Sequence, residues 1–322
     1  MTKTITKMIR LKNKVSFVLL AVVLMTTSCQ MFQRSQTIKP APPVKTIELE
    51  KTNPLNVITN PVGEAKINPE LSEPMIKPEV VRPQHIQVPK FGIIFSGGGA
   101  RTWGHVAVLK EMQKYKFPIL SVAGIEWGAF IAASYAQSAS ANEVEWEFSK
   151  MRDMDDWDQS LNTIYDKKST TGLKIPFVCP SYNLKTKTSY LLNRGPIAQL
   201  LSFCLPSAGL TEPYKSNLAY MNDVALLVNH LKATGVNKVI LINVLRQKND
   251  RPFMKGLNSP ENQIWTEAAL ALSKKAMGLD EVIEIDLSDY DIDAFNKKSD
   301  IMAKSAELSY NSIKRIADKY KL

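Results

Sequence analysis

The residues with the clearest chemical meaning lie in two glycine-rich turns, each placed between an apolar run and a helical pattern. The first turn, Gly97-Gly98-Gly99-Ala100-Arg101, follows the apolar run 91–95. Consecutive glycines at the start of a helix expose backbone N–H groups in a concave nest that attracts anions. The turn therefore indicates an anion or oxyanion site, and a tight strand-to-helix crossing would explain the same glycines equally well.

The second turn has the layout of a nucleophile elbow, in which a serine sits between two glycines on a sharp bend from strand to helix. Here the apolar run 119–123 leads into Gly124-Ile125-Glu126-Trp127-Gly128, so a glutamate occupies the central position. A carboxylate at that place would gain from the positive end of the helix that starts at Trp127. We expect it to accept the N–H groups of the nest and so to fill the site that catalysis would need.

The order and spacing of these turns resemble the patatin-like phospholipase family. The matching positions are Gly97–Arg101, His105, 107–110, Gly124 and Gly128. The resemblance covers roughly residues 90–245, with 175–178, 182–184 and 202–206 similar to later family segments. It implies that the nest is an oxyanion hole supported by Arg101, and that Glu126 stands in the place of the catalytic serine.

The second catalytic residue of the family, an aspartate, is also replaced on this comparison. Its best local match is Tyr220-Met221-Asn222-Asp223-Val224, which places Asn222 at the aspartate position. An amide cannot act as a general base. An acyl-enzyme formed on Glu126 would be an anhydride, which is unfavourable to form from an ester. We expect the Asn222 amide to donate a hydrogen bond to Glu126, and no residue of the catalytic pair to be intact.

Three functions remain open at this point. The first is a patatin-like pseudoenzyme that acts as a binding or scaffold protein, with a cleft for a lipid or acyl ligand. The second is an active lipid acyl hydrolase (a phospholipase or esterase) with an atypical nucleophile, for which Ser96, Ser121 and Ser207 are the nearest candidates. The third is a purely structural lipoprotein in which the cleft has collapsed.

The amino-terminal end predicts attachment to a membrane. Residues 1–28 combine a basic start, an apolar run at 15–25 and small residues, which is the pattern of a secretory signal peptide. Thr27-Ser28-Cys29 resembles a bacterial lipobox and makes Cys29 the predicted lipidation site; the alternative is ordinary secretion with a bystander cysteine. Acylation of Cys29 would anchor the protein in the membrane, by default the outer membrane facing the periplasm.

Composition separates a tether from one folded domain. Residues 29–89 are rich in proline and lysine without apolar periodicity, and predict a disordered tether. Residues 90–322 suffice for one domain.

The net charge of +10 falls to +5 without the signal region, because 36 basic residues then face 31 acidic ones. No basic run interleaved with aromatics indicates nucleic acid, and no spacing indicates a metal or cofactor. Cys179 and Cys204 are expected to be buried free thiols, with a disulfide as the alternative.

The pattern of the domain predicts an α/β fold. Short apolar runs at 91–95, 119–123, 175–178, 239–244 and 282–286 are typical of parallel strands covered on both faces. Helices are expected at 102–114, 127–136, 142–151, 224–233, 260–277 and 303–320. Their alternation predicts a patatin-like three-layer α/β/α sandwich with a mainly parallel sheet, and a site at the carboxyl ends of the strands.

Overall fold

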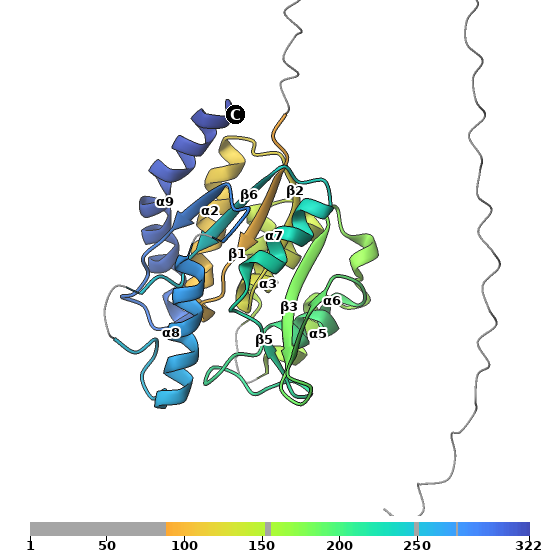
Figure 1. The fold of residues 1–322 in the computed structure, drawn as a ribbon, viewed down its shortest axis with the longest axis vertical. Helices are drawn as coiled ribbons and strands as arrows, with labels where there is room; N and C mark the ends of the chain where they lie inside the picture. Colours follow the sequence, from red (N-terminus) through yellow and green to blue (C-terminus); the bar gives the residue numbers. More distant parts are fainter. Residues whose placement is uncertain (1–87, 152–155, 248–250, 275) are drawn as a thin grey trace, which may run out of the picture. The chain divides into compact units, whose positions relative to one another are not determined.

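Figure 1 shows the computed structural model of the protein, which describes residues 88–151, 156–247, 251–274 and 276–322. The predicted signal peptide (1–28) and nearly all of the predicted tether (29–89) lie outside the described residues. Both therefore remain predictions.

The described residues form one mainly parallel sheet of seven strands in the order β4-β3-β2-β1-β6-β7, with β5 paired to β3. The β1–β2, β1–β6, β2–β3 and β6–β7 pairs are parallel, and β3 pairs antiparallel with β4 and β5. The strands are β1 (Phe91–Phe95), β2 (Ile119–Gly124), β3 (Phe177–Asn183), β4 (Thr188–Leu192), β5 (Asn217–Ala219), β6 (Lys238–Asn243) and β7 (Glu281–Glu284). The predicted fold class is confirmed.

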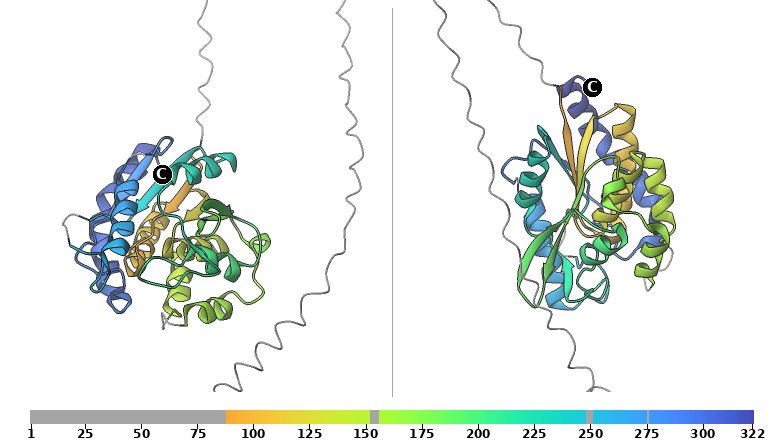
Figure 2. Two further views of the ribbon diagram at one scale, coloured as in Figure 1. Left: turned by 60° about the horizontal axis from the view of Figure 1, so that its bottom comes forward. Right: turned by 90° about the vertical axis from the view of Figure 1, so that its right-hand side faces the viewer.

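Helices cover both faces of this sheet, as the edge-on view in Figure 2 shows. They are α2 (Trp103–Lys114), α3 (Trp127–Ser138), α4 (Ala141–Ser149), α5 (Trp157–Ile164), α6 (Ile197–Cys204), α7 (Val224–Ala233), α8 (Ser259–Ser273) and α9 (Lys298–Tyr320), with 3-10 turns η1 (Gly99–Thr102), η2 (Thr170–Gly172) and η3 (Phe295–Lys297). The buried side chains of α2, α3, α4 and α9 share one hydrophobic cluster, and those of α7 and α8 share the other.

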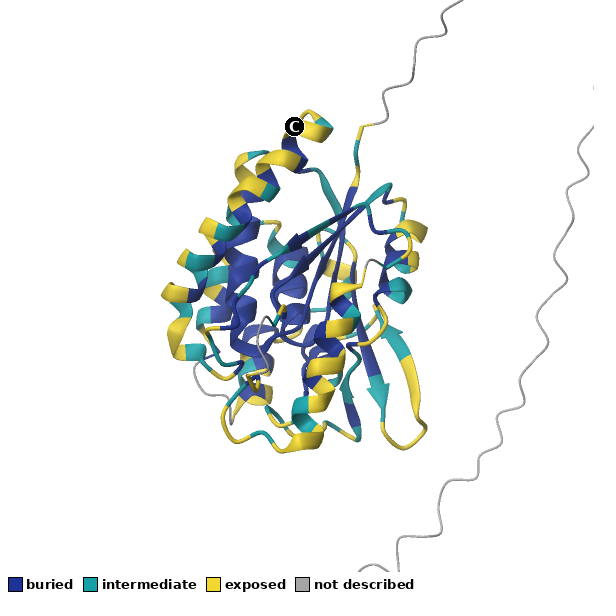
Figure 3. Cartoon of the chain, turned by 60° about the vertical axis from the view of Figure 1, so that its left-hand side comes forward, coloured by how far each residue is buried: buried dark blue, intermediate teal, exposed yellow. Residues whose placement is uncertain are grey.

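The central strand shows why the sheet needs two covering layers. Along β1, Phe91, Ile93 and Phe95 belong to the first cluster, whereas Ile94 belongs to the second. Successive strand side chains point to opposite faces, so an uninterrupted apolar strand is stable only when both faces are covered. Figure 3 shows the result, with buried residues in the sheet and along the inner sides of the helices.

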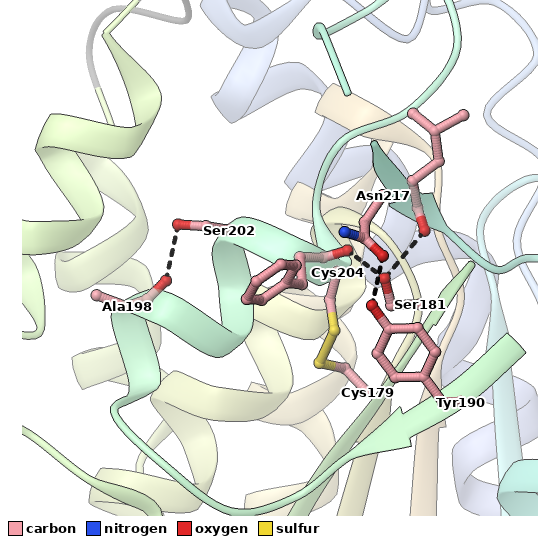
Figure 4. Close-up of a disulfide and its surroundings, with 9 residues drawn as sticks. Cys179, Ser181, Tyr190, Ala198, Ser202, Cys204 and Asn217 are labelled. Carbon is pink, nitrogen blue, oxygen red and sulfur yellow. Dashed lines mark hydrogen bonds between the residues drawn. A yellow bond between two sulfur atoms is a disulfide. The ribbon is translucent and has the colours of Figure 1, made fainter. Parts of the chain in front are cut away.

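A disulfide joins Cys179 on β3 to Cys204 at the end of α6, so the expectation of two free thiols was wrong (Figure 4). The two Cα atoms lie 6.1 Å apart, a separation that a disulfide can bridge. Ser181 on the same strand donates a hydrogen bond to the carbonyl of Phe203 at 2.7 Å. This contact holds the end of α6 against β3 and brings the two sulfur atoms together.

None of the described helices has the length and apolar character that crossing a membrane would require. The apolar run at 15–25 lies outside the part of the chain that was described.

Candidate functional site

The first glycine turn lies directly after β1 and has the backbone geometry of a nest. Gly98 and Gly99 have φ angles of 149° and 53°, which side chains other than glycine rarely adopt. A Cβ on Gly99 would lie 2.1 Å from the carbonyl oxygen of Ile292. A Cβ on Gly97 would lie 2.9 Å from the Cβ of Glu126. Glycine is therefore required at these positions both for the turn and for the approach of the elbow.

The second turn forms a strained elbow between β2 and α3. Glu126 has φ 53° and ψ −133°, an unfavourable conformation for any residue with a side chain. Its flanking glycines allow close backbone crossing, because a Cβ on Gly124 would lie 2.2 Å from the carbonyl oxygen of Gly128. A Cβ on Gly128 would in turn lie 2.4 Å from the carbonyl oxygen of Ser96. The bend places the side chain of Glu126 at the carboxyl end of the sheet, beside the nest.

The carboxylate of Glu126 occupies the nest. Its Oε2 accepts hydrogen bonds from the backbone N–H groups of Gly98 at 2.9 Å and Gly99 at 3.0 Å. Its Oε1 accepts one from the hydroxyl of Ser207 at 3.0 Å. The side chain is fully buried, so these donors take the place of water around the carboxylate.

Burial and hydrogen bonding act in opposite directions on the pKa of Glu126. Removal from water raises the pKa of Glu126 to about 7, while the N–H groups of Gly98, Gly99 and Trp127 and the Ser207 hydroxyl each favour the charged form and lower it. The pKa lies well above the ordinary glutamate value even with four donors present. Glu126 therefore changes its charge near neutral pH.

The structure does not bring Asn222 to Glu126 as the sequence comparison suggested. Asn222 is exposed, whereas Glu126 is fully buried and its Oε1 is bonded to Ser207. The reason lies in the start of α7. The Asp223 side chain caps that helix by accepting from two of its first N–H groups, and Met221, rather than Asn222, points its sulfur atom to within 3.4 Å of the Cβ position at Gly97. The expected Asn222–Glu126 hydrogen bond was wrong.

Ser207 takes the position opposite the elbow, and the other two candidate nucleophiles lie in structural hydrogen bonds. Ser96 donates to the carbonyl of Gly97 and accepts from the N–H of Val244. Ser121 donates to the carbonyl of Pro176. Ser207 was named from the sequence as a candidate, but its pairing with Glu126 joins residues 81 positions apart, and no local signal indicated that pair.

Arg101, which follows the glycine turn, holds the nest in place through hydrogen bonds to distant residues. Its Nε donates to the carbonyl of Tyr290 at 2.7 Å and its Nη1 donates to the side chain of Gln247 at 3.1 Å. The guanidinium also lies 5.3 Å from the ring centroid of Phe253. Burial lowers the pKa of Arg101 to about 10, so it stays charged at neutral pH. It ties η1 to two distant loops.

His105 on α2 is a buried, neutral side chain beneath the nest. Its Nε2 lies 2.8 Å from the carbonyl oxygen of Ser96, and its ring packs edge-on against Phe95. Burial lowers the pKa of His105 to about 4. A neutral histidine that bonds the strand end supports the turn.

A cavity of about 570 Å³ adjoins the turn that carries Ser207, and we call it the loop cavity. Its lining includes Leu210, whose side chain also lies 3.0 Å from the Cβ position at Gly99. The walls contribute two carboxylates, from Glu212 and Glu261, and apolar side chains. These residues are Trp157, Ala208, Gly209, Leu210, Thr211, Glu212, Pro213, Leu218, Met254, Gly256 and Glu261.

Within the described ranges, no group of three or more His, Cys, Asp or Glu side chains is placed to hold a metal ion. The arrangement at the end of the sheet is thus a glycine nest, a strained elbow and a buried carboxylate–hydroxyl pair.

Residues 93–195 match the patatin-like phospholipase family. The matched segment contains the nest and the elbow, and it ends before Ser207 and Asn222. The mainly parallel sheet flanked by helices is consistent with the patatin-like fold. The similarity to the patatin-like phospholipase family therefore covers the part of the chain that holds the nest and the elbow.

Curated relatives share this patatin-like region at low identity. The chain is 24% identical over 190 residues to lysophospholipase NTE1 of Pyricularia oryzae, covering 51% of this chain and 13% of the relative. It is 25% identical over 179 residues to lysophospholipase NTE1 of Candida albicans, covering 48% of this chain and 13% of the relative. The chain thus spans only about an eighth of the length of these relatives.

Proposed function

We propose that the protein is a patatin-like pseudoenzyme that binds a ligand or a partner in the cell envelope without hydrolysing it. The observation that carries the proposal is the position of the Glu126 carboxylate, which accepts the N–H groups of Gly98 and Gly99. An oxyanion formed during acyl transfer needs the same kind of donors, aimed at the point where its charge develops. In this site those donors already bond a carboxylate.

The remaining chemistry of the site also opposes hydrolysis. In its charged form, Glu126 would repel a developing oxyanion. As a nucleophile it would have to form an anhydride from an ester, with an alkoxide as the leaving group. The exposed amide of Asn222 supplies no base to the elbow.

An atypical acyl hydrolase is the second candidate, and the Ser207–Glu126 hydrogen bond is the observation that favours it. A hydroxyl 3.0 Å from a carboxylate has the spacing of a nucleophile and its base. Two features oppose this function. Ser207 is almost fully buried, and the carboxylate that would activate it is the group that fills the nest.

The loop cavity favours a binding protein over a purely structural one. Its volume of about 570 Å³ lies within the range of small-molecule sites. Leu210 joins its wall to the nest. A cavity next to the former catalytic position supports a retained cleft for a lipid or acyl ligand, or for a partner protein.

Attachment to the outer membrane through a lipidated Cys29 is part of the proposal and rests on the sequence alone. A chain anchored in this way would present its patatin-like domain to the periplasm.

The enzymatic part of the proposal is tested by turnover of a chromogenic short-chain ester and of a lysophospholipid. The purified protein is expected to show no turnover above that of buffer. Turnover that disappears in the Glu126→Gln variant would make Glu126 a working catalytic group and overturn the proposal.

A further inference from the structure

A second cavity lies at the amino end of strand β3, whereas the nest lies at the carboxyl ends of the parallel strands. It measures about 540 Å³ and is lined by η2, by the run that enters β3, by the loop after β4 and by the end of α7. The nest follows the carboxyl ends of β1 and β2, whereas this cavity precedes the first residue of β3, which is parallel to β2. We call it the amino-end cavity. In Figure 1, α7 lies beside β3.

Hydrogen bonds hold two walls of the amino-end cavity in place. Thr170 donates its N–H to the carbonyl of Gly195 at 3.0 Å, and Gly195 donates its N–H to the Thr170 hydroxyl at 3.1 Å. This reciprocal pair fixes the loop that carries Arg194. The run into β3 is held in turn by the N–H groups of Lys174 and Ile175, which both donate to the carbonyl of Ala136.

The two walls differ in chemistry. Leu173, Ile175 and Phe177 line one side, along the run that enters β3. Arg194 supplies the positive charge of the other side, next to the amide of Asn193. No aspartate or glutamate lines the cavity. Among the residues that the structure describes, no carboxylate lies within ion-pair distance of the Arg194 guanidinium.

We propose that the amino-end cavity binds an amphiphile with an anionic head group and a hydrocarbon tail. Arg194 would bond the head group, because a guanidinium matches the planar geometry of a carboxylate and also binds phosphate oxygens. The tail would lie over Leu173, Ile175 and Phe177. The loop cavity, which is lined by two carboxylates, has the opposite preference. The two cavities are therefore expected to bind ligands of different charge.

The test is isothermal titration calorimetry of the full chain with sodium decanoate below its micelle concentration. We expect saturable binding of one decanoate per chain, and no comparable binding of acetate or of decyltrimethylammonium. Tight acetate binding would show that the apolar wall has no part in recognition. Equal binding of decyltrimethylammonium would show that charge does not select the ligand. Either result, or no saturable binding of decanoate, would overturn the proposal.

Variants locate the site. Arg194→Gln should weaken decanoate binding by about tenfold or more, since a charge-assisted hydrogen bond is lost. Leu173→Ala should weaken it several-fold by removing apolar contact. Lys314→Gln on the exposed side of α9 removes the same charge elsewhere and should leave binding unchanged. Unchanged affinity in a folded Arg194→Gln variant would contradict the assignment. None of these results depends on whether Glu126 is catalytic.

Discussion

The hydroxyl of Ser207 donates a hydrogen bond of 3.0 Å to Oε1 of Glu126, while Oε2 of the same carboxylate accepts the N–H groups of the glycine nest. The elbow thus carries the carboxylate, and the residue facing it carries the hydroxyl. The family that the chain resembles has a serine at the elbow and an aspartate as its partner, so the buried pair of this site differs from the family's pair at the elbow itself. The pair is buried and fully bonded, which makes it a structural contact between the two halves of the site.

The first prediction concerns the pH dependence of stability. The pKa of Glu126 is raised to about 7 by burial, so the folded state holds a proton that the unfolded state releases near pH 4.5. This contribution is present below pH 4.5 and is lost as the pH rises to about 7. Glu126→Gln keeps the shape and removes the titration. At pH 8 we expect it to be more stable than the wild type by up to about 3 kcal/mol.

Urea unfolding at pH 5 and pH 8 measures this difference in the free energy of unfolding. His105, whose pKa is lowered to about 4, contributes with the opposite sign, because its neutral folded form loses stability as the pH falls from 6.5. That contribution cancels when variant and wild type are compared at the same pH. A Glu126→Gln variant less stable than the wild type at pH 8 would show that the charged carboxylate stabilises the fold.

The second prediction concerns the glycine nest. Gly99→Ala places a Cβ 2.1 Å from the carbonyl oxygen of Ile292 at a φ of 53°. We expect a loss of at least about 2 kcal/mol in the free energy of unfolding. Gly172→Ala is the matched control, because nothing lies within 4 Å of its Cβ position. Thermal melts of both variants give the comparison, and equal melting temperatures would contradict the geometry of the nest.

Sequence reasoning located the nest and the elbow because both depend on local patterns. Glycines at 97–99, 124 and 128, placed after apolar runs, specify tight turns without knowledge of distant contacts. The contacts between distant residues of the site could not be predicted from such local patterns. Ser207 meets Glu126 across 81 positions, and the orientation of Asn222 depends on how Asp223 caps α7. The hydrogen bond expected between Asn222 and Glu126 therefore failed, whereas the match of Asn222 to the family's aspartate position stays a prediction.

In the fold, too, locally specified elements could be predicted and elements that depend on distant pairing could not. The predicted strands at 91–95, 119–123 and 239–244 agree with β1, β2 and β6 to within one residue at each end, because each is a continuous apolar run. The short strands β4 and β5 were not predicted. They have mixed exposure and exist through antiparallel pairing with β3. Partners supplied by tertiary structure, such as Cys204 for Cys179, leave no local pattern in the sequence.

The third prediction concerns the disulfide. Cys179 and Cys204 enclose a separation of 25 residues, and removal of a native disulfide typically costs about 2–5 kcal/mol. The double variant Cys179→Ala/Cys204→Ala should lose stability within this range. Thiol titration of the unfolded, unreduced protein should find neither cysteine free. Two reactive thiols there, with a melting temperature insensitive to reductant, would restore the expectation of free cysteines.

The fourth prediction concerns membrane attachment through Cys29. Cys29→Ala should move the protein from the membrane fraction to the soluble or unprocessed pool, because the residue that would carry the acyl chains is lost. Labelling with a radioactive fatty acid provides the direct measurement. Ser28→Ala is the neighbouring control and should leave labelling intact. A wild-type protein without label, whose fractionation is unchanged in Cys29→Ala, would contradict the anchor.

The central claim is that Glu126 blocks hydrolysis by filling the nest, and ester turnover in a set of four proteins tests it most directly. The set comprises the wild type, Glu126→Ser, Ser207→Asp and the double variant, which places a hydroxyl at the elbow and a carboxylate at position 207, opposite it. We predict no turnover in the wild type or in either single variant, because each lacks the nucleophile, the base or an open nest. If any of the four acquires turnover, it should be the double variant. Turnover in the wild type that is lost in both single variants would contradict the account and make the Ser207–Glu126 pair a catalytic one.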